Sequence, residues 1–382
     1  MMTRLNNDHL KHQLLLGNEP IEINIRDVSF ESISKIKESG LPILIWGLGG
    51  MISFIYKNLT LSGVKIEYII DSDVKKQGLF YEGIEIISYE TAKSKLSEGI
   101  VLIGVCTLSY VKEITEKLSR DAIFTAVFTE LFYPLGSIAK EKISSNINKI
   151  EQVYTMLDDK ESKEIYCKKI QYMLSKQKTY LENFNKDEQY FDMKIVGNYL
   201  STHIGAFIDC GAYHGENTKE ALVFFPNNIS QSICIDADKN NIEYMNKYFK
   251  FYNSVRMIHA ACSRQSGFTY FDNSSERGGQ VSENKGELVN AISIDDEFYL
   301  SDNKILFIKM DIEGAEYDTL LGARKIIKRD CPVLAICIYH SIEDHWEIPL
   351  LIKEIFPRYK VYIRHYHYTG IETVVYAIPP DC

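Results

Sequence analysis

Apolar and polar residues alternate over the first third of the chain in the pattern of an α/β domain. Apolar runs at Leu41–Trp46 and Lys65–Ile70 flank a helical stretch that ends near Leu61. A helix is predicted at Ser109–Leu118, between the last two of three further strand-like runs, which are Ile84–Ile87, Gly99–Val105 and Ala122–Phe128. Strands that alternate with helices predict a mainly parallel sheet. We therefore expect a first α/β domain over residues 1–140.

A helical pattern separates this domain from the rest of the chain. Apolar residues recur every three or four positions from Ile143 through Ile150 to Leu157 and continue beyond. The pair Asp158-Asp159 interrupts the pattern and is suited to cap a second helix. We expect a helical connector over residues 141–193 that packs between two domains.

The remaining residues, 194–382, again alternate between strand-like and helix-forming segments. Seven strands are expected, around Ala206, Ser232, Val255, Ile305, Val333, Lys360 and Thr373. The last two are joined by Tyr366–Glu372, which is too short for a parallel crossover. The sequence therefore predicts a second α/β domain that ends in an antiparallel hairpin at the sheet edge.

One turn of this second domain has the composition of a cofactor site. The apolar strand Ala206–Cys210 contains Asp209 and leads into a turn with Gly211 and Gly215 before a helix begins. A pyrophosphate would lie against the charge of Asp209, which disfavours a dinucleotide. A carboxylate suits a ligand with a cationic end, such as the ammonium and sulfonium of S-adenosylmethionine.

The next strand ends in a second acid. Asp236 follows Ile229–Ile235, where a carboxylate can accept hydrogen bonds from both ribose hydroxyls of an adenosyl cofactor. The alternative is a helix-capping Asp209 and a turn-forming Asp236. The predicted cofactor site comprises Asp209, Gly211, Ala212, Tyr213, Gly215, Asn217, Thr218, Asp236, Ala237, Ala261 and Asp311.

Composition and charge limit the classes of partner. The chain has 382 residues with a formal net charge of −9 and a pI near 5.6, which argues against nucleic acid, since that partner needs a basic surface. Eight cysteines without a C-x-x-C pair predict reduced, buried thiols. Without a signal-type apolar segment or a predicted membrane span, we expect a cytoplasmic protein. A homo-oligomer is left open.

Three polar residues near the ends of later strands are candidates for catalysis. Asp311 and Glu313 follow one predicted strand and His340 follows the next, so all three are expected at one edge of the sheet. We hypothesise that His340 is a general base, with Asp311 as the competing base. The same side chains with Asp344 would offer mainly oxygen ligands, of the kind that magnesium takes, but no metal is predicted.

At these residues the chain resembles the FkbM-type S-adenosylmethionine-dependent methyltransferases. The resemblance rests on Phe207–Thr218, Ile308–Gly322, Pro332–Pro349 and Tyr359–Pro379. It implies cofactor contacts at Asp209, Gly211, Gly215 and Asp236, a substrate crevice bordered by Asp311, Glu313 and His340, and a saccharide or nucleotide-linked sugar as acceptor. The implied fold class is α/β, with two Rossmann-like domains joined by a helical segment, the C-terminal one a class I methyltransferase sheet with a terminal antiparallel hairpin.

The predicted terminal hairpin carries a cationic and aromatic cluster around Arg364 and His365. We expect both residues at the turn, where they would bind the acceptor by stacking on a sugar or by pairing with a diphosphate. The alternative is that they solvate an edge strand.

The first domain carries a weaker signal. Gly47-x-Gly49-Gly50 has Ile52 where the dinucleotide fingerprint has its third glycine, although Asp71 lies where a ribose-binding acid is expected. This domain resembles nucleotide-binding-type domains attached to some polysaccharide-biosynthesis proteins. The leading interpretation is an O-methyltransferase of surface-polysaccharide biosynthesis; the alternatives are an NAD-dependent sugar-modifying oxidoreductase that uses the first domain and a non-catalytic scaffold.

Overall fold

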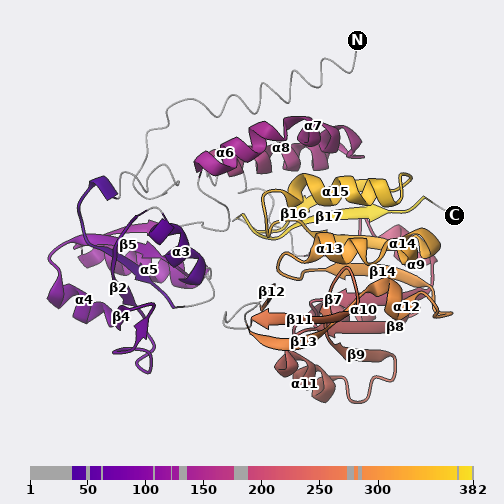
Figure 1. Ribbon diagram of the computed structural model, residues 1–382, viewed down its shortest axis with the longest axis horizontal. Helices are drawn as coiled ribbons and strands as arrows, with labels where there is room; N and C mark the ends of the chain where they lie inside the picture. The colour runs from indigo at the N-terminus through magenta and orange to yellow at the C-terminus, as the bar shows by residue number, and fades with distance from the viewer. Residues whose placement is uncertain are drawn as a thin grey trace, which may run out of the picture.

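The computed structural model describes residues 37–48, 52–61, 63–105, 108–121, 123–128, 136–175, 188–272, 279–282, 286–367 and 370–380 (Figure 1). Gly49 and Gly50 of the first glycine-rich turn lie outside these ranges, as do Cys106 and Cys382. Within the described part of the chain, no helix has the length and apolarity needed to cross a bilayer.

The first sheet has the order β3-β4-β2-β1-β5-β6. Its strands are β1 (Ile43–Trp46), β2 (Ile66–Ile70), β3 (Phe80–Tyr81), β4 (Ile84–Ile87), β5 (Gly99–Ile103) and β6 (Phe124–Phe128), and all except β3 are parallel to their neighbours. The accompanying helices are α3 (Ile52–Leu61), α4 (Tyr89–Lys95) and α5 (Leu108–Asp121). This confirms the predicted α/β class, with the strand order reversing between β1 and β5.

The second sheet has the order β16-β17-β15-β14-β7-β8-β9 and reverses between β7 and β14. All seven expected strands are present as β7 (Gly205–Cys210), β8 (Ile229–Asp236), β9 (Val255–His259), β14 (Ile305–Met310), β15 (Val333–Cys337), β16 (Lys360–His365) and β17 (Thr373–Ile378). Its helices are α9 (Gly197–Thr202), α10 (Glu216–Phe224), α11 (Lys239–Tyr248), α12 (Ile294–Phe298), α13 (Glu316–Leu321), α14 (Arg324–Asp330) and α15 (Asp344–Ile355). A ligand crevice is expected where such an order reverses.

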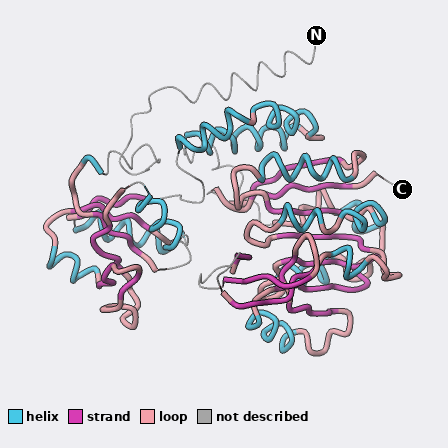
Figure 2. The backbone as a smooth tube through the Cα atoms, viewed as in Figure 1, coloured by secondary structure: helices cyan, strands magenta, loops and turns pink. Residues whose placement is uncertain are grey.

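The terminal hairpin is antiparallel as predicted, and helices cover its outer strand β16 (Figure 2). The connector forms α6 (Gly136–Ser145), α7 (Ile147–Met156) and α8 (Lys160–Ser175). Asp158 accepts a hydrogen bond from the Val361 amide, and Ser162 accepts one from the Ile363 amide. These bonds satisfy donors that an open sheet edge would leave unpaired. Residues of α7 and α8 share one hydrophobic cluster with the second sheet.

The residues between β9 and β14 form a further, smaller β-sheet that the sequence did not predict. It has the order β10-β13-β11-β12, with β10 (Ala261–Cys262), β11 (Gly267–Asp272), β12 (Gln280–Ser282) and β13 (Glu287–Ile292). Phe271 and Val281 are opposite each other on one face of this sheet, and both line the cavity described below.

Candidate active site

The turn after β7 is shaped by two glycines with left-handed backbone. Gly211 has φ 73°, and a Cβ there would collide with the carbonyl oxygen of Asp311 on the neighbouring strand end. Gly215 has φ 75° at the start of α10, where a Cβ would collide with the Phe249 ring. Glycine is therefore required at both positions for the turn to fit under β14 and α11.

Asp236 closes this turn from the end of β8. Its carboxylate accepts hydrogen bonds from the Tyr213 amide at 2.8 Å, the Asp238 amide at 2.8 Å and the Asn241 side chain at 3.1 Å. Burial raises the pKa of Asp236, and the three donors oppose that shift. A carboxylate offers about four acceptor positions, so room remains on Asp236 for a ligand hydroxyl.

A cavity of about 730 Å³ opens at this edge of the sheet, between the ends of β7, β8 and β14. Most of the predicted cofactor residues line it, namely Gly211, Ala212, Tyr213, Asn217, Asp236, Ala237, Ala261 and Asp311. Its charged lining comprises five carboxylates and one ammonium: Glu216, Asp236, Asp238, Asp311, Glu313 and Lys309. An excess of carboxylates favours a ligand with positive charge.

The expected cofactor contact at Asp209 is corrected by the structure. Asp209 is fully buried, and the register of β7 and β14 places it opposite Lys309, whose Nζ lies 3.1 Å from Asp209 Oδ1. Thr218, another predicted cofactor residue, donates its hydroxyl to Asp209 Oδ2 at 2.9 Å instead of facing the cavity. The acid is neutralised inside the sheet because its β7 side chain meets a lysine of the adjacent strand.

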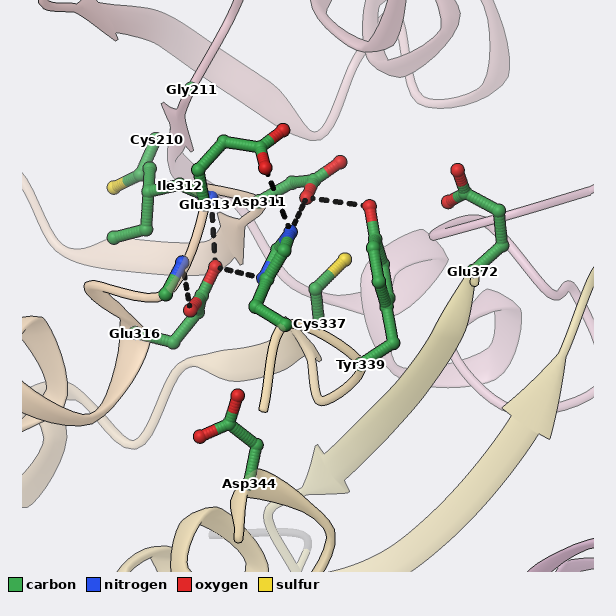
Figure 3. Close-up of polar contacts among 12 residues, drawn as sticks. Cys210, Gly211, Asp311, Ile312, Glu313, Glu316, Cys337, Tyr339, Asp344 and Glu372 are labelled. Atoms are coloured by element: carbon green, nitrogen blue, oxygen red, sulfur yellow. Dashed lines mark hydrogen bonds and ion pairs between the residues drawn. The ribbon is translucent and has the colours of Figure 1, made fainter. Parts of the chain in front are cut away.

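Beyond the turn, a cluster of carboxylates surrounds His340 (Figure 3). His340 is 9% exposed; its Nδ1 lies 3.0 Å from Glu316, and its Nε2 lies 3.4 Å from Asp311 and 3.6 Å from Glu313. Neither ring nitrogen makes a hydrogen bond of good geometry. Each nitrogen of the ring therefore faces a different carboxylate.

The charge of His340 does not suit the base that the sequence suggested. Burial acts against a charged ring, but the carboxylates of Glu316, Asp311 and Glu313 outweigh it and raise the pKa of His340 to about 10. At neutral pH the ring is an imidazolium and has no lone pair to accept a proton. We therefore withdraw the assignment of His340 as base and interpret it as the cation that holds the carboxylates together.

Glu313 and Asp311 differ in proton affinity although they are close in sequence. Burial within the cavity walls raises the pKa of Glu313 to about 7, helped by Asp311 and Glu316 and opposed by His340 and Lys309. Burial also acts on Asp311, but Lys309, His340 and two tyrosine hydroxyls outweigh it and lower the pKa of Asp311. Of these two carboxylates, Glu313 is the one with a pKa near neutrality, and its side chain is still 42% exposed.

The same cluster bears on the magnesium alternative. Asp311, Glu316 and His340 offer ligand atoms within 4.8 Å of one another. However, Glu316 already accepts bonds from the Ile312 amide at 2.8 Å and the Gly314 amide at 3.1 Å. Asp344 accepts one from the Ser341 amide at 2.7 Å. A protonated ring forms ion pairs with both Glu316 and Asp311, whereas one metal ion could be bound by only one ring nitrogen, so the geometry favours an ion-pair cluster.

Arg364 and His365 do not lie where the sequence suggested. Both belong to β16 and are almost completely buried, at 3% and 0% exposure. Arg364 pairs with Asp159 at 2.6 Å and donates to Ser162 at 2.8 Å, and His365 Nδ1 lies 2.9 Å from the Thr373 hydroxyl. Their assignment as acceptor ligands is corrected: Arg364 fixes the connector helices to the sheet.

Several residues of the site had no recognisable signal in the sequence. Tyr190 and Tyr339 donate their hydroxyls to Asp311 at 2.8 Å and 3.1 Å. Glu372 receives a hydrogen bond from Gln189, and burial raises its pKa to about 7, with Asp311 adding to the shift. Positive φ at residues other than glycine occurs at four site positions, Tyr190, Tyr213, Glu313 and Glu372. Such backbone strain is typical of functional sites, and only coordinates could show it.

Comparisons with known proteins give a matching family and a similar fold. Residues 209–369 match the family described as the methyltransferase FkbM domain. The methyltransferase FkbM from Methylobacillus flagellatus KT has a similar structure, with a TM-score of 0.69 and 18% identity, covering 97% of this chain and 100% of that one. A precorrin-6y C5,15-methyltransferase from Geobacter metallireducens GS-15 gives a TM-score of 0.30 at 12% identity, covering 52% of this chain and 95% of that one. No curated protein matches the sequence.

Proposed function

Residues 209–369 belong to the FkbM methyltransferase family, and from this premise we propose that the chain transfers the methyl group of S-adenosylmethionine to a saccharide hydroxyl, with Glu313 as general base. The observation that carries the proposal is the acid-lined cavity at the ends of β7, β8 and β14, with Glu313 in its wall. A synthetic role in surface polysaccharide and a cytoplasmic location fit this proposal.

The residues of the turn bind the methyl donor. Asp236 accepts hydrogen bonds from the ribose, and the tight turn at Gly211 brings its backbone close to the cofactor. The carboxylate of Asp311 stabilises the positive end of the donor, which the sulfonium and ammonium supply. Lys309 is held by Asp209 and by the Gly211 carbonyl at 2.8 Å, so its charge is largely compensated.

Transfer is an in-line displacement. A lone pair of the acceptor oxygen attacks the methyl carbon, the carbon–sulfur bond breaks, and its electron pair stays on sulfur, which becomes neutral. The hydroxyl proton moves to Glu313, while Asp311 stays ionised between Tyr190, Tyr339 and the His340 imidazolium. The protein thus contributes alignment and a base of suitable pKa.

The test combines binding and turnover in the full chain. We expect S-adenosylhomocysteine to bind measurably by calorimetry, and labelled S-adenosylmethionine to methylate a panel of glycosides. Glu313→Gln should keep that affinity and lower kcat by roughly 10²–10⁴-fold, the usual contribution of a general base. The matched control is Glu354→Gln, an exposed glutamate on α15 that pairs with Arg324. No binding in the parent protein would refute the proposal.

The pH profile identifies the base. Below its folded pKa of about 7, Glu313 is protonated and cannot accept a proton, so kcat/KM should fall about tenfold per pH unit on the acid side. This limb should disappear in Glu313→Gln and persist in Glu354→Gln. A limb that persists unchanged in Glu313→Gln would assign the titration to another group, for which Glu372 is the first candidate.

A further inference from the structure

The carboxylates around His340 outnumber the cations close to them. Asp311, Glu313 and Glu316 all lie within 3.6 Å of the single ring of His340. Glu372 is a fourth carboxylate on the far side of Tyr339 (Figure 3). It interacts electrostatically with Asp311, His340 and Glu313. The cations that act most strongly on Asp311 and Glu313 are His340 and Lys309.

Lys309 does not neutralise the excess negative charge of these carboxylates. Its ammonium is 3.1 Å from Asp209, a fully buried acid that has no other cation opposite it across the β7–β14 register. The remaining cation, His340, is nine-tenths buried, and neither of its nitrogens is satisfied by a well-formed hydrogen bond. The wall of the cavity at Asp311 and Glu313 therefore carries excess negative charge.

Resting on the proposed function, we infer that the acceptor is a sugar without negative charge at the reacting residue. Asp311 and Glu313, which line the cavity, reject uronic acids and sugar phosphates by repulsion, and Glu372 adds to the negative potential at both. Two anions a few ångströms apart repel more strongly in a partly desolvated site than in water, and like-charge contact is a common basis of specificity. Neutral and amino sugars meet no such repulsion. This inference disfavours the nucleotide diphosphate end of a linked sugar as the group bound here.

The chemistry of the carboxylates supports the same assignment. Glu313 and Glu372 both hold protons more tightly than ordinary glutamates, because burial and neighbouring acids disfavour their charge. An additional anion would strengthen that effect and protonate the base needed for transfer. A neutral polyol, in contrast, can donate hydroxyl hydrogens to Asp311 and Glu313, the two of these carboxylates that line the cavity.

The test uses the full chain with four matched acceptors: a methyl hexopyranoside, its 2-amino analogue, its uronate and its 6-phosphate. At low salt we expect kcat/KM for the two anionic sugars to be at least about tenfold below that of the neutral sugar. Glu372→Gln should reduce this ratio several-fold, Glu354→Gln should leave it unchanged, and high salt should reduce it in the parent enzyme.

The outcomes separate the two claims. Equal or better transfer to the uronate or the phosphate would overturn the inference and leave the methyltransferase proposal standing. Transfer to none of the four sugars, with S-adenosylhomocysteine still bound, would overturn the proposed saccharide activity and the inference with it. The ratio between acceptors is measured within one protein, so it does not change if part of the Glu372→Gln variant is unfolded. The salt dependence is measured on the parent enzyme and needs no variant.

Discussion

Each of the two large sheets contains a strand–turn–strand unit with the same hydrogen-bonding pattern but different neighbouring residues. We call the sheet of β1 and β2 with its helices the first unit, and the sheet of β7 and β8 with its helices the second unit. At the end of β2, Asp71 accepts bonds from the Leu48 amide at 3.0 Å and the Asp73 amide at 2.8 Å. At the end of β8, Asp236 accepts the equivalent pair from Tyr213 and Asp238, both at 2.8 Å. In each unit, the acid at the end of the second strand ties down the turn after the first.

The differences lie in the neighbouring residues. Lys76 is 3.8 Å from Asp71, whereas the neutral side chain of Asn241 donates to Asp236. The strand next to β1 continues into Gly104 and Val105, whereas the strand next to β7 continues into Asp311, Ile312 and Glu313. The turn is therefore a structural feature common to both units, and the strand across the switch point carries the groups to which we assign the reaction.

The largest effect is expected for the buried ion pair between Asp209 and Lys309, next to the turn at Gly211. Ile45 precedes Gly47 by two positions, where the second unit has Asp209 before Gly211. Lys309→Met or Asp209→Asn should each destabilise the second unit by about 3–5 kcal/mol, because an unpaired charge or polar group stays buried. The double change Asp209→Leu/Lys309→Met should recover most of that loss and make the second unit resemble the first.

The chain offers a selective probe for this measurement. Its two tryptophans are Trp46, in the first sheet, and Trp346, in α15 of the second unit. Denaturant unfolding followed by Trp346 fluorescence in a Trp46→Phe background reports the second unit. Single variants as stable as the parent would show that the pair contributes little, and that the comparison has overstated this difference.

A smaller effect is expected for the two strand-end acids. Asp236→Ala should weaken S-adenosylhomocysteine binding by roughly 10–100-fold, since a charge-assisted hydrogen bond contributes about 1.5–3 kcal/mol. Asp71→Ala should leave that affinity unchanged. Calorimetry on both variants decides the matter: equal weakening by Asp71→Ala would mean that the first unit also takes part in binding the cofactor.

The smallest effect is expected for Lys76→Ala. The ion pair with Asp71 is long, and the Lys76 side chain is 27% exposed, so unfolding of the first unit should change by less than about 1 kcal/mol. Trp46 fluorescence in a Trp346→Phe background measures this unit. A change as large as that of Lys309→Met would show that the first turn depends on its cation as strongly as the second.

The strands and the position of the site could be predicted because both depend on local pattern. Apolar runs that end in Asp236 and Asp311 predicted strands whose ends meet, and the short Tyr366–Glu372 link required an antiparallel hairpin. The small sheet β10–β13 was missed, because its strands Gly267–Asp272 and Glu287–Ile292 are half exposed and contain polar residues that weaken an apolar signal.

The roles of individual side chains were less predictable. The charge of His340 depends on three carboxylates gathered from the loop after β14 and from α13. The burial of Arg364 depends on Asp159, more than two hundred positions earlier in the chain. Tyr190 reaches Asp311 from a segment that precedes the matched family region. None of these pairings leaves a periodic or compositional trace in the sequence.

The sequence by itself determined the fold class, the terminal hairpin and the turn at Gly211, because hydrophobic spacing and chain connectivity act over a few residues. The neutralisation of Asp209 by Lys309 and the raised pKa values of Glu313, about 7, and His340, about 10, follow instead from the packing of the folded chain. The physical reason is that charge states depend on distances and burial, which are set by how strands and helices distant in sequence pack together.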